Sequence, residues 1–194
     1  QVSDDEFLKS NFEYPVYCNL ETKDYVIHKN KKPFELKHFI EFPREYESRT
    51  YEYLKVSDLF ISAHYWDPSS PKIFTKEQMK QFLKLKIIGD ITCDVDGSVP
   101  TTIKSTTIEE PNFFLNTEIF SETDKSDGNL AIMAVDNLPS ELPRDSSTEF
   151  GNGIVNEVIP YILEEDDGRI LNSTITAEGR FLKKYNYLNE YINS

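Results

Sequence analysis

The sequence has little of several residue types, and each shortage excludes a class of protein. Two cysteines, Cys18 and Cys93, are too few for a disulfide framework and favour a reducing compartment. Only 21 basic residues face 34 acidic ones, and the net charge of −13 argues against nucleic-acid binding. No apolar run approaches the roughly 18 residues of a membrane span, and residues 1–6 lack a signal-peptide pattern. We therefore expect a cytoplasmic protein that binds neither nucleic acid nor membranes.

The usual metal-binding spacings, such as HExxH and CxxC, are also missing. The segment 90–98 contains three aspartates, but counted from Asp94 its glycine comes too early for an EF-hand loop. These carboxylates either cap a turn or, at Asp94, accept hydrogen bonds from the hydroxyls of a ligand. The three histidines, His28, His38 and His64, lie in unrelated sequence contexts, and only His64 follows a predicted strand. The sequence therefore predicts no metal site.

Signals for nucleophilic catalysis and phosphate binding are missing too. There is no GxSxG motif, and neither cysteine has a recognisable partner, so both are interpreted as small buried apolar residues. The nearest approach to GxGxxG is Gly151-Asn152-Gly153, which lies within a predicted helix. The catalytic residues are therefore unknown from the sequence, and the phosphate-binding turn of a dinucleotide domain is not in this chain.

The residues that are present predict an α/β fold. Residues 58–63 and 86–91 have strand patterns, and between them Thr75 and Gln78 have capping-box spacing that starts a helix. A strand, a helix and a strand at this spacing form a parallel βαβ unit. Residues 130–135 are a third apolar strand. Near the N-terminus we expect a helix after Ser3, a strand over 15–20, and a polar insertion over 21–50 that adds little core.

The C-terminal part is predicted to be helical. Pro143 opens a long helix with an apolar residue every four positions, and Pro160 should kink its last turns. A terminal helical segment is expected over 177–192. Three polar loops follow the predicted strands, after Ala63, Ile91 and Val135. Ligands of open α/β sheets bind beyond the carboxyl ends of the strands, so these loops are the candidate ligand site.

Three segments taken together point to a known family. They are Ser-Ala-His-Tyr-Trp-Asp-Pro at 62–68, Asp-Ile-Thr-Cys-Asp-Val-Asp-Gly-Ser at 90–98, and Val-Asp-Asn-Leu-Pro-Ser-Glu-Leu-Pro-Arg at 135–144. Their order and spacing resemble the lysine–ketoglutarate reductase and saccharopine dehydrogenase family, within the alanine dehydrogenase/transhydrogenase superfamily. Val95-Asp96-Gly97 and Glu110-Pro111 differ from the alanine dehydrogenase pattern and favour the saccharopine branch.

The resemblance implies a fold, a coenzyme and a set of contacts. Residues 1–137 would be the C-terminal part of a Rossmann-like domain with a parallel sheet, entered at its second strand, with 21–50 as an insertion. Residues 138–194 would be a long helix returning to a substrate domain, followed by the C-terminal part of that domain. The coenzyme would be NAD or NADP. Its implied contacts are Ala63 and His64 near the adenosine ribose, Ile91 and Asp94 at the nicotinamide ribose, and Val135, Asn137 and Leu138 at the nicotinamide end.

The implied activity is that of an NAD(P)-dependent oxidoreductase acting on amino-acid C–N bonds, with a small amino-acid substrate. Because the family's acid–base residues lie in a part not represented here, we expect this chain to be inactive alone. The alternative is a non-catalytic α/β binding or regulatory module that kept the scaffold. Quenching of the Trp66 fluorescence by NADH would favour the enzyme. We also expect exposed apolar surface and hence self-association as a homo-oligomer.

Overall fold

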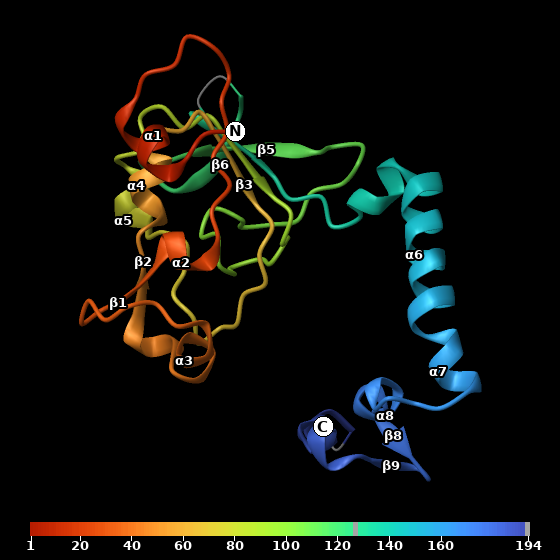
Figure 1. Ribbon diagram of the computed structural model, residues 1–194. Helices are drawn as coiled ribbons and strands as arrows, with labels where there is room; N and C mark the ends of the chain where they lie inside the picture. Colours follow the sequence, from red (N-terminus) through yellow and green to blue (C-terminus); the bar gives the residue numbers. More distant parts are fainter. Residues whose placement is uncertain (126–127, 193–194) are drawn as a thin grey trace. The chain divides into compact units, whose positions relative to one another are not determined.

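The computed structural model describes residues 1–125 and 128–192 of the 194-residue chain. It divides into two compact units, Gln1–Leu138 and a second unit that begins at Pro139 (Figure 1). Within the described residues, no helix combines the length and apolar character that a membrane crossing requires.

The first unit mixes short helices with strands (Figure 1). Its helical segments are α1 (Asp4–Lys9), α2 (Thr22–Tyr25), α3 (Leu36–Glu41), η1 (Pro43–Glu45), α4 (Thr50–Leu54) and α5 (Lys76–Met79), and η2 (Leu138–Glu141) begins at its last residue. Its strands are β1 (Val26–His28), β2 (Tyr46–Ser48), β3 (Leu59–Ser62), β4 (Ile87–Asp90), β5 (Asn112–Asn116), β6 (Ser121–Thr123) and β7 (Leu130–Met133).

A five-stranded sheet in the order β3-β4-β7-β5-β6 is the centre of this unit. Strands β3, β4 and β7 are parallel, with Ile88 of β4 opposite Phe60 on one side and Ile132 on the other. This confirms the predicted α/β fold and the three predicted strands. Strands β5 and β6 are antiparallel additions that the sequence analysis did not predict, so the sheet is mixed.

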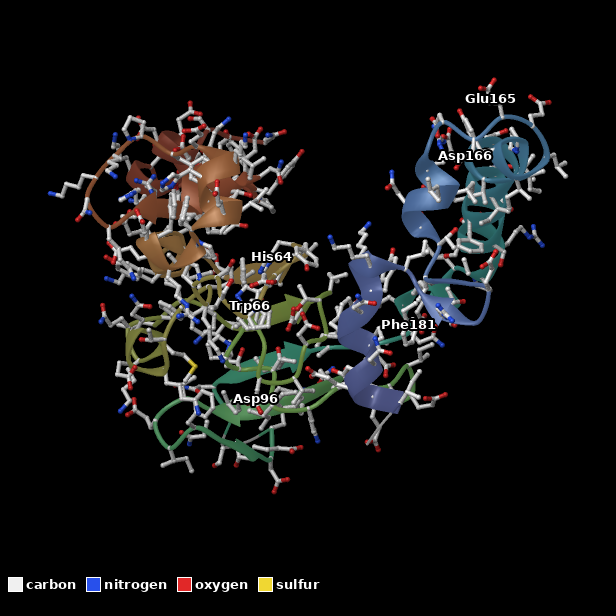
Figure 2. The ribbon with its side chains drawn as sticks, turned by 90° about the horizontal axis from the view of Figure 1, so that it is seen from below. His64, Trp66, Asp96, Glu165, Asp166 and Phe181 are labelled. Atoms are coloured by element: carbon white, nitrogen blue, oxygen red, sulfur yellow. The ribbon has the colours of Figure 1, made fainter. Side chains whose placement is uncertain are left out.

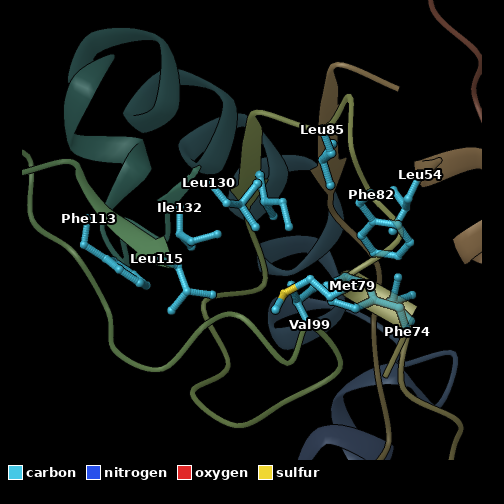
Figure 3. Close-up of a cluster of buried hydrophobic side chains, with 12 residues drawn as sticks. Leu54, Phe74, Met79, Phe82, Leu85, Val99, Phe113, Leu115, Leu130 and Ile132 are labelled. Carbon is cyan, nitrogen blue, oxygen red and sulfur yellow. The ribbon is translucent and has the colours of Figure 1, made fainter. Parts of the chain in front are cut away.

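The hydrophobic core lies between the sheet and the segments around α4 and α5 (Figure 3). Ile88, Leu115 and Ile132 come from three neighbouring strands and are fully buried. Met79 and Phe74 reach them from α5 and the loop before it. Full burial of such a side chain stabilises the fold by about 1.5–3 kcal/mol. The capping box of Thr75 and Gln78 forms as predicted, although α5 has only one turn.

One expectation for the N-terminal part is wrong, because residues 15–20 form no strand. The Tyr17 carbonyl of this segment accepts a hydrogen bond from the Val2 N–H at 3.0 Å. The insertion 21–50 supplies none of the buried residues of the main core cluster, but Tyr46 and His28 are buried in its own antiparallel β1–β2 ladder. Its lysines are exposed while its aromatic residues pack together, and composition alone did not separate the two groups.

The second unit consists of one long helix followed by several short elements. They are α6 (Pro143–Glu157), α7 (Ile159–Leu163), α8 (Arg169–Ser173), β8 (Thr176–Ala177), β9 (Arg180–Phe181), η3 (Lys183–Leu188) and α9 (Asn189–Ile192). The break before Pro160 confirms the predicted kink. The expected helix over 177–192 is wrong at its start, where a β8–β9 hairpin turns through Gly179 at φ +74°. None of the residues of α6 is buried.

Candidate functional site

The carboxyl ends of β3, β4 and β7 lie at one edge of the central sheet. These three strands are parallel neighbours, so the loops that follow them emerge side by side. The Ile91 N–H donates to the Ser62 carbonyl at 2.8 Å and extends the β3–β4 pairing to the first residue of the loop. The geometry therefore brings together the three loops that the sequence analysis selected.

The loop after β4 is fixed by the fully buried carboxylate of Asp90. One of its oxygens accepts from the Thr92 N–H at 3.1 Å and from the Thr92 hydroxyl at 2.7 Å. The other accepts from the Thr102 hydroxyl at 2.5 Å. A buried carboxylate needs such donors, because water is not available to solvate it. Asp90 thus joins the beginning of the loop to its end.

Between these anchors a tight turn presents Asp94 to solvent. The Gly97 N–H donates to the Asp94 carbonyl at 2.9 Å. A Cβ atom at Gly97 would lie only 2.7 Å from that carbonyl oxygen, so no larger residue fits the turn. Cys93 and Asp96 have φ angles of +56° and +57°, in the left-handed region. The side chain of Asp94 is exposed, which leaves its carboxylate able to accept hydrogen bonds from a ligand.

Cys93 connects the loop after β4 with the end of β7. Its thiol lies 3.1 Å from the Val135 carbonyl and 3.4 Å from the Asp90 carbonyl, close enough for a weak S–H donor. Burial raises the pKa of the Cys93 thiol, and the nearby carboxylates of Asp90 and Asp136 raise it further. The residue therefore stays a thiol and holds the two loops together. Cys18 and Cys93 are both half-buried, so the expectation that they are buried apolar residues is wrong.

His64 lies on the loop after β3 (Figure 2), and its two ring nitrogens differ in their hydrogen bonding. Its Nδ1 lies 3.1 Å from the Ser62 hydroxyl, whereas the buried Nε2 has no hydrogen-bond partner among the described residues. Burial lowers the pKa of His64, and the charges of Asp90 and Asp94 oppose that shift. If the Ser62 hydroxyl donates to Nδ1, the neutral ring carries its proton on Nε2 and offers it to a ligand acceptor.

The aromatic pair after His64 divides into one packed and one exposed residue. The Trp66 Nε1–H lies 3.3 Å from the carbonyls of both Ser70 and Pro71, which fixes the indole against its own loop (Figure 2). Tyr65 is 92% exposed. Trp66 is therefore a fluorescent reporter held two residues from His64.

The predicted site residues differ in what they can offer to a ligand. Their placements in the structure are as follows: Ala63, Ile91, Asp94 and Asn137 are exposed, His64 and Leu138 are half-buried, and Val135 is buried. Val135 can therefore contribute only its main chain, and its carbonyl already accepts from Cys93. Sequence reasoning missed the supporting role of Thr102, because nothing in its spacing connects it to Asp90 twelve residues earlier.

A large hollow borders the outer flank of β3. Its volume is about 1480 Å³, and it extends from the segment 10–20 to Ser62 and His64. Single-ligand pockets are typically about 300–1,000 Å³, so one bound molecule would not fill this hollow. On the same flank Ile61 is 61% exposed, at the edge of the described sheet.

Two of the three histidines lie next to each other in the structure. The rings of His28 and His38 stack at a centroid distance of 5.8 Å, and Glu45 lies beside them. His64 is not part of this cluster. Their sequence contexts gave no sign of this proximity, because it is the β1–β2 ladder and α3 that bring the two rings together.

The fold is that of a Rossmann-like α/β domain followed by a C-terminal helix. The sequence comparisons identify the family to which this domain belongs. The chain belongs to the family described as the alanine dehydrogenase/PNT C-terminal domain, which it matches over residues 19–184. This confirms the family resemblance drawn from the three loop segments.

Individual relatives agree with this assignment. An alpha-aminoadipic semialdehyde synthase of Arabidopsis thaliana is 28% identical over 187 residues, covering 90% of this chain and 18% of that protein. The mitochondrial enzyme of the same name from Bos taurus is 23% identical over 84% of this chain and 21% of its own length. Alanine dehydrogenase 2 of Staphylococcus aureus is 30% identical over 57% of this chain and 26% of its own length. The chain thus spans about a fifth of the length of the first two relatives.

Proposed function

We propose that this chain supplies the nicotinamide-side half of the coenzyme site in an NAD(P)-dependent oxidoreductase that acts on amino-acid C–N bonds. The observation that carries the proposal is the alignment of three loops at the carboxyl ends of the parallel strands β3, β4 and β7. These loops present the exposed carboxylate of Asp94 and the buried His64 Nε2, which has no hydrogen-bond partner in the part of the chain that the structure describes. Membership of the alanine dehydrogenase/PNT family and the names of the relatives support the reaction class.

The residues at this edge fit the ribose and carboxamide of a nicotinamide nucleotide. A carboxylate at a strand end accepts hydrogen bonds from ribose hydroxyls, which is the role proposed for Asp94. The side-chain amide of Asn137 carries both a donor and an acceptor, as recognition of a carboxamide requires. His64 Nε2 would donate to an acceptor nearer the adenosine end. When bound, the coenzyme supplies the hydride chemistry, and the chain positions it.

The three loops would bind and orient the coenzyme, and they would not supply the acid–base catalyst. Asp94 is fixed by the Asp90 and Gly97 contacts, and Cys93 keeps the loop after β7 next to it. No residue of these loops is proposed to move a proton to or from the substrate. We therefore propose that the chain alone does not turn over. The substrate would be a secondary amine or imine that joins two amino-acid skeletons.

Coenzyme binding tests this proposal with a matched pair of variants. NADH should quench the fluorescence of Trp66, and Asp94→Asn should weaken the NADH affinity by about tenfold, since a hydrogen bond to a charged group contributes about 1.5–3 kcal/mol. Asp96→Asn is the control, because Asp96 is exposed in the same turn and Asn tolerates its positive φ. Equal effects of the two variants, or no response to NADH in a protein containing this chain, would contradict the proposal.

A further inference from the structure

The insertion brings together two imidazoles and a carboxylate at metal-ligand distances. His28 is the last residue of β1, His38 lies in α3 and Glu45 is the last residue of η1. One potential ligand atom of each lies within 4.8 Å of the other two. His28 Nε2 is 3.1 Å from Glu45 Oε2, and the two imidazole rings stack with 29° between their planes.

The backbone fixes this arrangement. His28 is paired with Tyr46 in the β1–β2 ladder, so Glu45 precedes the partner of His28 by one residue. The Lys29 N–H donates to the Glu45 carbonyl at 2.9 Å and holds η1 against the end of β1. Helix α3 ends at Glu41 and leads into η1 within two residues, which returns the chain from His38 to Glu45. The three groups thus come from three elements joined by main-chain contacts (Figure 1).

The surroundings of His38 resemble the support that a ligating imidazole normally has. Its Nδ1 lies 3.0 Å from the hydroxyl of buried Tyr46, which orients the ring and leaves Nε2 to act as a ligand. The ring of Phe42 packs against His38 at 5.0 Å, and that of Phe39 packs against Tyr46 at 5.1 Å. Aromatic side chains therefore shield one side of the cluster. Glu45 is exposed and leaves the other side open to water.

We propose that His28, His38 and Glu45 bind one divalent transition-metal ion, with zinc as the best match. Two imidazoles and one carboxylate with a position open to solvent are a common zinc ligand set. Imidazole also suits copper and nickel, whereas magnesium and calcium prefer oxygen ligands throughout. The ion would tie α3 to the β1–β2 hairpin. This inference is independent of the coenzyme proposal.

Metal binding changes the hydrogen bonds of His28 in a defined way. Without metal, its Nδ1 accepts from the Asn30 N–H at 3.0 Å, so the neutral ring carries its proton on Nε2, facing Glu45. A metal ion on Nε2 would require the other tautomer, in which the same proton sits on Nδ1. The Asn30 N–H would then lose its acceptor, and the metal would replace the His28–Glu45 hydrogen bond.

Zinc stoichiometry and affinity in the chelator-treated protein test the proposal. After dialysis against zinc, mass spectrometry of the metal content should find one ion per chain, and cobalt should give the visible absorption of a low-symmetry site. His38→Gln should weaken binding at least about tenfold, the loss typical of removing even a supporting contact. His64→Gln is its control, since His64 is outside the cluster. Glu45→Gln should act like His38→Gln. Glu47→Gln should not, because Glu47 lies in β2 opposite Ile27 of β1 and is outside the cluster.

Two results would overturn this inference: less than stoichiometric zinc after dialysis, or zinc and cobalt binding that His38→Gln and Glu45→Gln leave unchanged. Far-UV circular dichroism of each variant establishes that it folds. His38 and Glu45 are not fully buried, so their variants keep the test valid even where a change at buried His28 disrupts the hairpin.

Discussion

At the scale of single residues, a fully buried carboxylate anchors both ends of the loop after β4. Asp90 is fully buried and accepts three hydrogen bonds, from the main chain and hydroxyl of Thr92 and the hydroxyl of Thr102. Exposed Asp94 has no such role in folding. Two carboxylates four residues apart thus have different surroundings: Asp90 is buried and shapes the loop, and Asp94 is exposed, where we propose that it binds the coenzyme.

We predict that Asp90→Ala lowers the free energy of unfolding by about 2–3 kcal/mol, because it leaves buried donors without an acceptor. Asp94→Ala should change it by no more than about 0.5 kcal/mol, as is usual for exposed positions. Urea denaturation of the two variants measures both values. Equal losses would contradict the division of roles.

His64 gives a prediction about pH. Burial lowers its pKa in the folded state below the unfolded value of about 6.5, so the unfolded chain binds the proton more readily. Stability should therefore be highest above about pH 6.5 and fall as the pH drops through the window between the two pKa values. His64→Gln should reduce this fall. Denaturation midpoints across that window test it, and identical pH profiles for the two proteins would exclude a contribution from His64.

The candidate site could be predicted only in part from single residues. The rule that ligands bind beyond strand ends found the loops that carry Ala63, Ile91 and Asn137, because each follows an apolar run ending in polar residues. It could not reveal that the Val135 side chain points into the core or that Cys93 reaches its carbonyl. A contact between residues 42 positions apart depends on the assembled sheet, so the local sequence cannot predict it.

At the scale of elements, strong local signals were reliable and compositional ones were not. The capping box at Thr75 and the kink at Pro160 both form, because each depends on neighbouring residues alone. The lysine-rich composition of 21–50 concealed the aromatic packing around Tyr46. Strands β5 and β6 were missed. They pair with each other, and β5 joins the sheet only through β7, which comes later in the chain.

The cap of α5 allows a test at this scale. The Thr75 hydroxyl accepts from the Gln78 N–H at 3.2 Å, and α5 carries Met79 into the core. Thr75→Ala should therefore lower the free energy of unfolding by about 1 kcal/mol. Thr75→Ser keeps the hydroxyl and should cost much less, as measured by thermal denaturation. Similar losses in both variants would assign the effect to the methyl group instead of the cap.

At the scale of the whole molecule, the first unit exposes apolar side chains on an edge strand beside its candidate site. Strand β3 is at the edge of the described sheet, and Leu59 and Ile61 are more than half exposed there. An unpaired edge strand with apolar side chains favours pairing with another chain. This feature belongs to the same strand whose end carries His64.

We predict that the chain self-associates through this flank in a concentration-dependent manner. Ile61→Lys should shift the distribution toward monomer in sedimentation velocity, because an edge lysine opposes strand pairing. Leu83→Lys is the comparison, because Leu83 is also exposed and lies outside the described strands. Association that neither substitution alters would place the contact elsewhere.

The central claim is that the carboxyl edge of β3, β4 and β7 binds the nicotinamide half of a coenzyme. The most direct test is two-dimensional NMR of the ¹⁵N-labelled chain titrated with NADH and, separately, with nicotinamide mononucleotide. The account predicts that both ligands shift the amide signals of Ile91, Asp94 and Asn137, that NADH also shifts those of Ala63 and His64, and that the signals of the β1–β2 hairpin stay in place. Shifts confined to other surfaces, or none at saturating ligand, would contradict it.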